Sequence, residues 1–201
     1  MKKQVVVIHG GDTFESYEEY ISFLRDFVID AVDFFKGKGW KDTLQEDLGD
    51  EYEVLTPKMP NKNNAKYEEW KIWFEKLLPF LRNDVILVGH SLGGIFIAKY
   101  LSENIFPLNI RATFLIAAPY DALDAEYTLA DFDLPTNLIN FSNQGGNIHI
   151  YHSKDDLVVL FADLEKYKKQ LPTAHCSELE DRGHFGQEHF PELVAEIKKL
   201  N

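Results

Sequence analysis

The sequence holds a single cysteine, Cys176. One cysteine excludes a disulfide within the chain, and a chain without disulfides suits a reducing compartment. The apolar–polar alternation of residues 175–179 favours a structural place in a strand for Cys176 over a role as nucleophile. We therefore expect a cytoplasmic protein.

Positive charge is also scarce, since 21 lysines and arginines stand against 33 aspartates and glutamates, for a formal net charge of −12 at pH 7. Such a surface repels the phosphates of nucleic acids and of anionic membranes, and no basic stripe offsets it. Long apolar runs are missing as well: none reaches the length of a transmembrane helix, and the run after Met1 is expected to be a strand, because it is too short for a signal peptide. We therefore expect neither nucleic acid nor membrane as a partner, and nothing in the sequence supports a protein partner.

The chain has no internal repeat and no low-complexity tract, and 201 residues suit a single domain, expected to span 1–201. Short β-branched runs alternate with helical patterns. This alternation predicts the α/β class, a three-layer αβα sandwich with a mostly parallel sheet of about six strands. The strands are expected at 5–8, 52–56, 85–88, 112–117, 148–151 and 176–179, and the helices at 17–35, 67–81, 95–103, 161–171 and 191–200.

A glycine–serine motif follows the third predicted strand. Gly89-His90-Ser91-Leu92-Gly93 matches G-x-S-x-G, and an apolar strand leads into it while a helical pattern follows, which is the setting the motif requires. The serine of this motif lies on a sharp turn that exposes its hydroxyl, and the flanking glycines remove Cβ atoms that would collide there. Ser91 is thus the candidate nucleophile, although a glycine-rich loop without catalysis has the same pattern. The adjacent His90 is expected to point away and to have a packing or supporting role.

Candidates for the base and the acid lie further along the chain. Hydrolases with this motif place an acid and then a histidine after the serine. Asp155 and Asp156 follow the fifth predicted strand and His184 follows the sixth, so all three lie at carboxyl ends of strands, where open α/β sheets collect their active residues. Gly183 gives His184 the freedom to reach over the serine. Spacing alone leaves both aspartates open as the acid.

The other histidines do not suggest a metal site. His149 and His152 lie three residues apart on or near a strand, so their side chains diverge, and His175 and His189 belong to separate elements. We expect all four to be structural or surface residues, and we expect neither a metal nor a cofactor.

Two backbone amides are candidates for an oxyanion hole. The first strand ends at His9-Gly10-Gly11. In hydrolases of this type, the loop after that strand and the residue after the nucleophile each supply one N–H group. The amides of Gly11 and Leu92 fit these positions, although the two glycines also fit a simple tight turn.

The substrate pocket is the least determined part of the prediction. Tyr120, Phe132 and Phe185 lie near predicted strand ends and are the aromatic residues expected to form its walls. Only segment 119–146 is expected to be long enough to cover the site, and its acidic residues do not suit an apolar lid. We therefore predict a preference for short acyl groups.

With these motifs in place, the chain resembles the small serine hydrolases typified by the retinoblastoma-binding serine hydrolase and its bacterial relatives. The resemblance spans nearly the whole chain. It is carried by His9-Gly10-Gly11, by Lys58-Met59-Pro60-Asn61 with Trp70 following, by the Ser91 motif, by Ser153-Lys154-Asp155-Asp156 and by Gly183-His184-Phe185. It implies a minimal α/β-hydrolase fold, activity on small esters, and Asp156 as the acid, with Leu160 standing where the family often has proline.

Residues and resemblance together predict a cofactor-free hydrolase of small carboxylic esters whose substrate is a small acyl compound. Ser91 attacks the carbonyl, His184 takes its proton, Asp156 holds the imidazole, and water later releases the acyl group. Two alternatives stay open. One is a thioesterase or peptidase with the same triad, and the other is a protein-interaction module on a hydrolase fold with vestigial activity.

Overall fold

The computed structural model describes residues 1–29, 37–123, 125 and 127–200. Its sheet has six strands in the order β2-β1-β3-β4-β5-β6, and every neighbouring pair is parallel. The strands are β1 (Lys3–Ile8), β2 (Tyr52–Leu55), β3 (Val85–His90), β4 (Ile110–Ile116), β5 (Asn147–Ser153) and β6 (His175–Leu179). All six predicted strands are confirmed with small shifts at their ends, and so is the αβα fold class.

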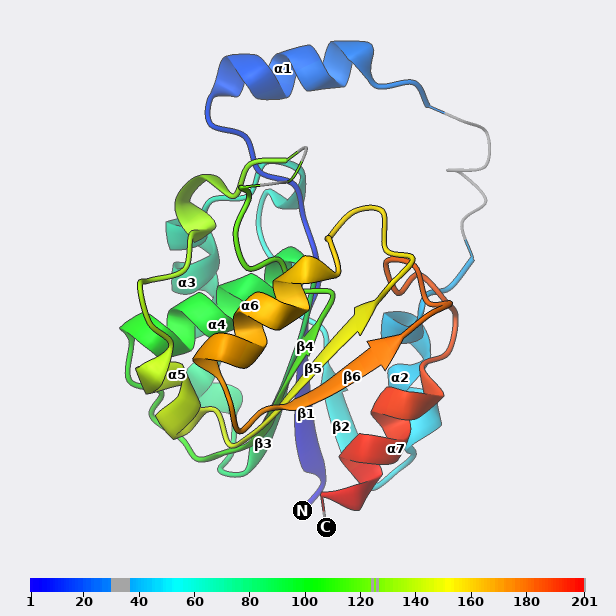
Figure 1. Ribbon diagram of the computed structural model, residues 1–201. Coiled ribbons are helices and arrows are strands. Elements are labelled where there is room, and N and C mark those ends of the chain that lie inside the picture. The colour runs from blue at the N-terminus through cyan, green and yellow to red at the C-terminus, as the bar shows by residue number, and fades with distance from the viewer. Residues whose placement is uncertain (30–36, 124, 126, 201) are drawn as a thin grey trace.

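Helices cover both faces of the sheet (Figure 1). One face carries α3 (Tyr67–Glu75), α4 (Leu92–Glu103), α5 (Ile139–Gln144) and α6 (Ala162–Gln170), and the other carries α2 (Trp40–Leu48) and α7 (Pro191–Lys199). A further helix, α1 (Tyr17–Asp26), extends above the body of the protein rather than along the sheet (Figure 1). Within the described ranges, no helix combines the length and the apolar character needed to span a membrane.

The strands alternate their side chains between two apolar cores. In β1, Val6 and Ile8 pack toward α4, whereas Val5 and Val7 pack toward α2 and α7. Because both faces are covered, the strand is apolar at every one of these positions, as is typical of a parallel sheet. This explains why continuous β-branched runs locate the strands in the sequence.

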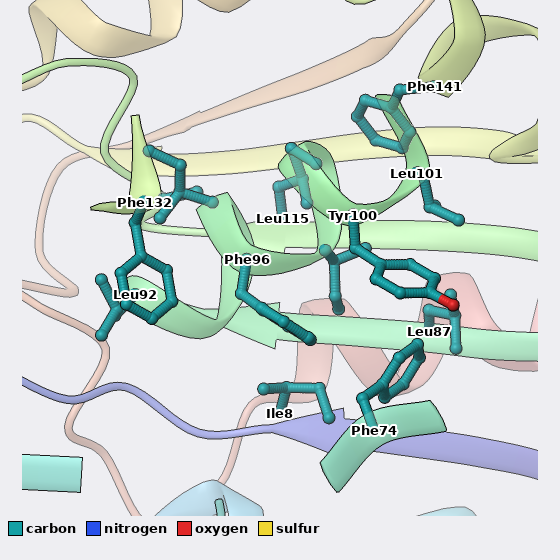
Figure 2. Close-up of a cluster of buried hydrophobic side chains, with 14 of the residues drawn as sticks. Ile8, Phe74, Leu87, Leu92, Phe96, Tyr100, Leu101, Leu115, Phe132 and Phe141 are labelled. Atoms are coloured by element: carbon teal, nitrogen blue, oxygen red, sulfur yellow. The ribbon is translucent and has the colours of Figure 1, made fainter. Parts of the chain in front are cut away.

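The larger core fixes α4 against the sheet (Figure 2). Phe96 and Tyr100 project from α4 toward Phe74 of α3, and the centroid of the Phe74 ring lies 5.5 Å from that of Phe96 and 5.0 Å from that of Tyr100, both edge to face. Edge-to-face pairs of this kind add to the stabilisation from burial. These contacts fasten α4 to α3, and the first residue of α4, Leu92, directly follows the candidate nucleophile.

Some helices differ from those predicted. The predicted helix 17–35 ends at Asp26, residues 27–29 are not helical, and the rest of that prediction lies outside the described residues. The predicted helix 67–81 ends at Glu75 and is followed by a 3₁₀ turn at Leu78–Phe80. Pro79 has no N–H to donate to the carbonyl of Glu75, four residues before it, and its ring would clash with that carbonyl, which explains the change. The helix α2 was not predicted, because only its buried Trp40, Leu44 and Leu48 mark an apolar stripe in an otherwise polar stretch.

Candidate active site

Ser91 lies on a strained turn between β3 and α4. Its backbone has φ 55° and ψ −125°, a left-handed conformation that is costly for a residue with a side chain. The turn is held by hydrogen bonds at both ends, since the Ser91 N–H donates to the Ile116 carbonyl (2.8 Å) and the Ser91 carbonyl accepts from the Gly94 N–H (2.8 Å). Non-glycine residues in such conformations cluster at functional sites. The strain therefore makes Ser91 a candidate functional residue independently of its motif.

The glycines of the motif are required by the space around them. A Cβ atom on Gly89 would lie 2.4 Å from the Gly93 carbonyl oxygen, and one on Gly93 would lie 2.3 Å from the Ile8 carbonyl oxygen. Both distances are shorter than any real contact of a Cβ atom. The steric role predicted for these glycines is confirmed. The short distance between Gly93 and the Ile8 carbonyl shows that the turn brings α4 against the end of β1.

Asp156 and His184 form a hydrogen-bonded pair near the ends of β5 and β6. The His184 Nδ1 lies 2.9 Å from the Asp156 Oδ2. A carboxylate only accepts, so Nδ1 carries the proton and Nε2 keeps its lone pair. The Asp156 side chain is fully buried, and its Oδ1 accepts from the N–H groups of Val158 (2.8 Å) and Val159 (3.0 Å). These two bonds orient the carboxylate toward the imidazole.

Asp155 bonds to different groups. Its Oδ1 accepts from the Ser153 hydroxyl (2.5 Å) and from the Gly183 N–H (2.9 Å). These bonds, that of Ser153 first, hold the pKa of the Asp155 carboxyl below its usual value. The structure thus places Asp156 against His184, while Asp155 ties down the turn that carries His184.

A cleft of about 720 Å³ opens beside these residues, a volume typical of small-ligand sites. Its lining brings together the predicted Ser91, His184, Gly11 and Leu92. Asp156 lies behind His184, buried from the cleft. The apolar part of the lining is formed by Phe14, Phe23, Leu92, Pro119, Leu129, Val158 and Val159. The candidate reactive residues therefore border a cavity whose walls are partly apolar and partly polar.

The three aromatic residues expected as pocket walls lie elsewhere, which corrects that prediction. Phe132 and Phe185 are completely buried in opposite cores, and Phe185 packs on Phe190 with ring centroids 5.2 Å apart. Tyr120 packs edge-on against Tyr167 at 5.1 Å. None of the three lines the cleft. The physical reason is the direction in which the side chains point. The positive φ of Phe185, 54°, turns its side chain into the core, although Phe185 directly follows His184 in the sequence.

Sequence reasoning missed the contribution of α1. Phe14, which precedes this helix, and Glu19 and Phe23 within it line the cleft. The Phe14 ring contacts the ring of Phe23 with centroids 5.2 Å apart. The expectation that only segment 119–146 covers the site is therefore wrong. The aromatic residues of 14–27 were the available signal, but their pattern alone does not show where the helix lies.

His9 supports the loop that carries Gly11. Its Nδ1 donates to the Gly10 carbonyl (2.6 Å), and its Nε2 accepts from the Met59 N–H (2.9 Å). Burial is the main cause that lowers the pKa of His9, which suits the neutral form that this pair of bonds requires. On Gly11, a Cβ atom would lie 2.5 Å from the Lys62 carbonyl oxygen. Only glycine fits at this position without a shift of the backbone.

The other histidines do not come together as the ligands of one metal site. His149 stacks between Phe114 and His175, and His189 bonds to Asp47 on the surface. His152 is completely buried. Across the described ranges, no three histidine, cysteine, aspartate or glutamate side chains are grouped as metal ligands would be.

A parallel αβα sandwich that presents a strained serine between a central strand and a buried helix defines the α/β-hydrolase class. Within that class, the chain matches the model of the family described as serine hydrolase over residues 36–195. The chain therefore belongs to this serine hydrolase family and is a hydrolase, as the sequence resemblance implied.

Solved structures show the same fold along nearly the whole chain. The ydeN gene product from B. subtilis is 20% identical with a TM-score of 0.71, and the match covers 99% of this chain and 98% of that one. The esterase domain of a Rhodothermus marinus protein is 16% identical with a TM-score of 0.62, over 98% and 83% of the two chains. A thioesterase domain from the curacin biosynthetic pathway is 11% identical with a TM-score of 0.61, over 98% and 91%. At these identities the likeness concerns the fold.

Proposed function

We propose that this hydrolase cleaves small carboxylic esters through a Ser91–His184–Asp156 triad and a covalent acyl-enzyme. The observation that carries the proposal is the bond of 2.9 Å between the buried Asp156 carboxylate and the His184 Nδ1, with His184 lining the same cleft as the strained Ser91. This arrangement leaves the His184 Nε2 as a free base on the cleft side of the ring.

In the proposed mechanism, the Ser91 oxygen attacks the acyl carbonyl while the His184 Nε2 takes its proton. Asp156 holds the tautomer with hydrogen on Nδ1 and stabilises the imidazolium that forms. His184 then returns the proton to the leaving alcohol, and the acyl group stays on Ser91. A water molecule then attacks the carbonyl of the acyl-enzyme while His184 takes a proton from the water. This step releases the carboxylic acid and restores the Ser91 hydroxyl.

The amides of Gly11 and Leu92 are proposed to bind the oxyanion. Leu92 begins α4, and the first N–H groups of a helix have no acceptor within the helix. Gly10, which precedes Gly11, approaches the nucleophile so closely that a Cβ atom there would lie 3.5 Å from the Ser91 Oγ. The two loops thus meet at the serine, where the charge on the tetrahedral intermediate develops.

A panel of substrates with one common acyl group tests this function. We expect the wild type to hydrolyse p-nitrophenyl butyrate faster than a butyryl thioester and much faster than butyryl p-nitroanilide. Ser91→Ala should lower kcat on the ester by at least about 10³-fold, because it removes the nucleophile. A higher kcat/KM on the thioester or the amide would reassign the substrate class. No turnover on any of them by folded wild type would favour a vestigial site.

A further inference from the structure

His90, the neighbour of Ser91, connects two parts of the site. Its Nε2 lies 2.9 Å from the His184 carbonyl oxygen, and its Nδ1 lies 3.2 Å from the Nζ of Lys41. Since a carbonyl only accepts, Nε2 carries the hydrogen and donates, and Nδ1 accepts from the lysine. The ring is buried and packs edge-on to Trp40. His90 is therefore held as one defined neutral tautomer.

Lys41 has an unfavourable position for a structural lysine. It lies in the first turn of α2, where the helix dipole disfavours a cation. Its neighbour Asp42 uses its carboxylate to cap the Gly39 N–H (2.9 Å). Over the described part of the chain, the ammonium of Lys41 forms no ion pair with a carboxylate. The ammonium lies 5.0 Å from the centroid of the Trp40 ring and has Asp42 as an opposite charge nearby. Burial nevertheless lowers the pKa of Lys41 to about 8, so a charged lysine at this place costs stability and its bond to His90 calls for a role.

We propose that Lys41 and His90 are positioning residues for His184: Lys41 holds His90 as the neutral Nε2–H tautomer, and the bond from His90 to the His184 carbonyl fixes the backbone that carries the base. The proposal rests on the proposed role of His184. Asp156 orients the His184 ring, whereas His90 fixes the main chain of the same residue. Ring and backbone are thus held by separate groups.

The charges around His90 favour its neutral form. It faces Lys41 from α2, His9 from the end of β1, and His184 from the loop after β6. Burial first, and then these neighbours, keep the pKa of His90 well below its usual value. The ring centroids of His90 and His184 lie 4.9 Å apart, so a charged His90 would oppose the imidazolium that forms during catalysis. Burial and Lys41 together thus prevent a competing charge beside the base.

Two variants separate positioning from simple packing. His90→Leu removes the donor to the His184 carbonyl, and we expect kcat to fall about 10- to 100-fold with KM little changed, as is usual when a reacting group loses its exact support. His90→Gln keeps an N–H donor of similar reach and should recover much of kcat. Equal losses of kcat in both variants, with folding intact, would show a packing role and overturn the proposal.

Lys41→Met gives the sharper test, because it keeps the side-chain stem and removes the charge. We expect the pKa of His90 to rise in this variant but to stay below its ordinary value, because one neighbouring charge is removed while burial remains, and this adds a second ionisation to the acid limb of the kcat/KM profile. Lys38→Met, which removes an exposed lysine nearby, should keep the wild-type profile. NMR of the labelled histidine rings reads the tautomer and pKa of His90 without any substrate.

The two readouts distinguish the two proposals. If the pKa of His90 differs between Lys41→Met and wild type while wild type hydrolyses no substrate, the proposed function fails, but the interaction between Lys41 and His90 is supported. If the wild type is active and Lys41→Met leaves the NMR titration of His90 and the pH profile unchanged, the positioning role is overturned.

Discussion

At the scale of single residues, two adjacent aspartates with the same chemistry are separated by their hydrogen bonds. The Asp156 carboxylate is buried against His184, and Asp155 holds the turn before it. Spacing in the sequence left both aspartates open as the acid, because the turn after a strand decides in which direction each side chain points. The family resemblance pointed to Asp156, and the geometry agrees with that choice.

We predict that Asp156→Asn lowers kcat by about 10³–10⁴-fold, because the amide favours the wrong imidazole tautomer. Asp155→Asn is the matched control and should cost far less, since it only weakens the bonds from Ser153 and Gly183. Steady-state kinetics on p-nitrophenyl butyrate measure both. A larger loss in Asp155→Asn would transfer the role of the acid to Asp155.

Buried histidines outside the triad make stability depend on pH. His152 is completely buried, and burial lowers its pKa to about 4. In the unfolded chain, histidine has a pKa near 6.5, so the unfolded state binds more protons between these values. The stabilisation is fully present above about pH 6.5 and is lost as pH falls toward 4. His90, whose pKa is lowered in the same direction, adds to the effect.

We therefore predict that the free energy of unfolding falls from pH 7 to pH 5, with about 2 kcal/mol of the loss due to His152. His152→Phe removes the titrating group and should reduce the loss by about that amount. Urea unfolding at pH 7, 6 and 5 measures it. The same decrease in wild type and variant would show that folding does not lower the pKa of His152.

At the scale of elements, the strands were predictable and the pocket was not. Continuous apolar runs reveal strands that are covered on both faces, and the G-x-S-x-G motif gives the place of the serine turn. The cleft walls depend instead on how α1 and the loops lie over the sheet, which no periodicity encodes. Phe132 shows the problem, because an aromatic residue near a strand end proved to be a core residue.

The position of α1 leads to a prediction about acyl length. Phe23 lines the cleft, whereas its neighbour Leu24 does not, although the two side chains are similarly exposed, at 39% and 46%. Phe23→Ala should lower kcat/KM for p-nitrophenyl hexanoate by about 5-fold, the value of roughly one lost apolar contact, and leave the acetate nearly unchanged. Leu24→Ala is the control and should change neither.

The same series of p-nitrophenyl esters also tests the predicted preference for short acyl groups. The palmitate ester should be a poor substrate of every variant, because an extended long acyl chain needs a long apolar groove, whereas polar side chains such as Asp12, Glu19 and Lys62 also line this cleft. A steady rise of kcat/KM toward palmitate would contradict this. Equal effects of Phe23→Ala on acetate and hexanoate would remove α1 from the acyl site.

At the scale of the whole molecule, parallel topology brings the site together. Ser91 follows β3, Asp156 follows β5 and His184 follows β6, and the carboxyl ends of parallel strands share one edge of the sheet. Residues that are separated by nearly half of the chain therefore lie at the same edge of the sheet, because the strands run in the same direction. This is why the order of motifs along the sequence was enough to predict Ser91, His184 and the pair Asp155–Asp156, while the choice of Asp156 came from the family resemblance and side-chain directions required the structure.

Labelling with a fluorophosphonate tests whether Ser91 is a nucleophile that His184 and Asp156 activate. The probe reacts with activated serines without the need for a known substrate. We predict that wild type is labelled at Ser91, as peptide mass spectrometry would show, and that Asp155→Asn is labelled at a similar rate. Asp156→Asn should be labelled far more slowly, and Ser91→Ala not at all. Equal labelling of wild type and Ser91→Ala, or no labelling of folded wild type, would contradict the account.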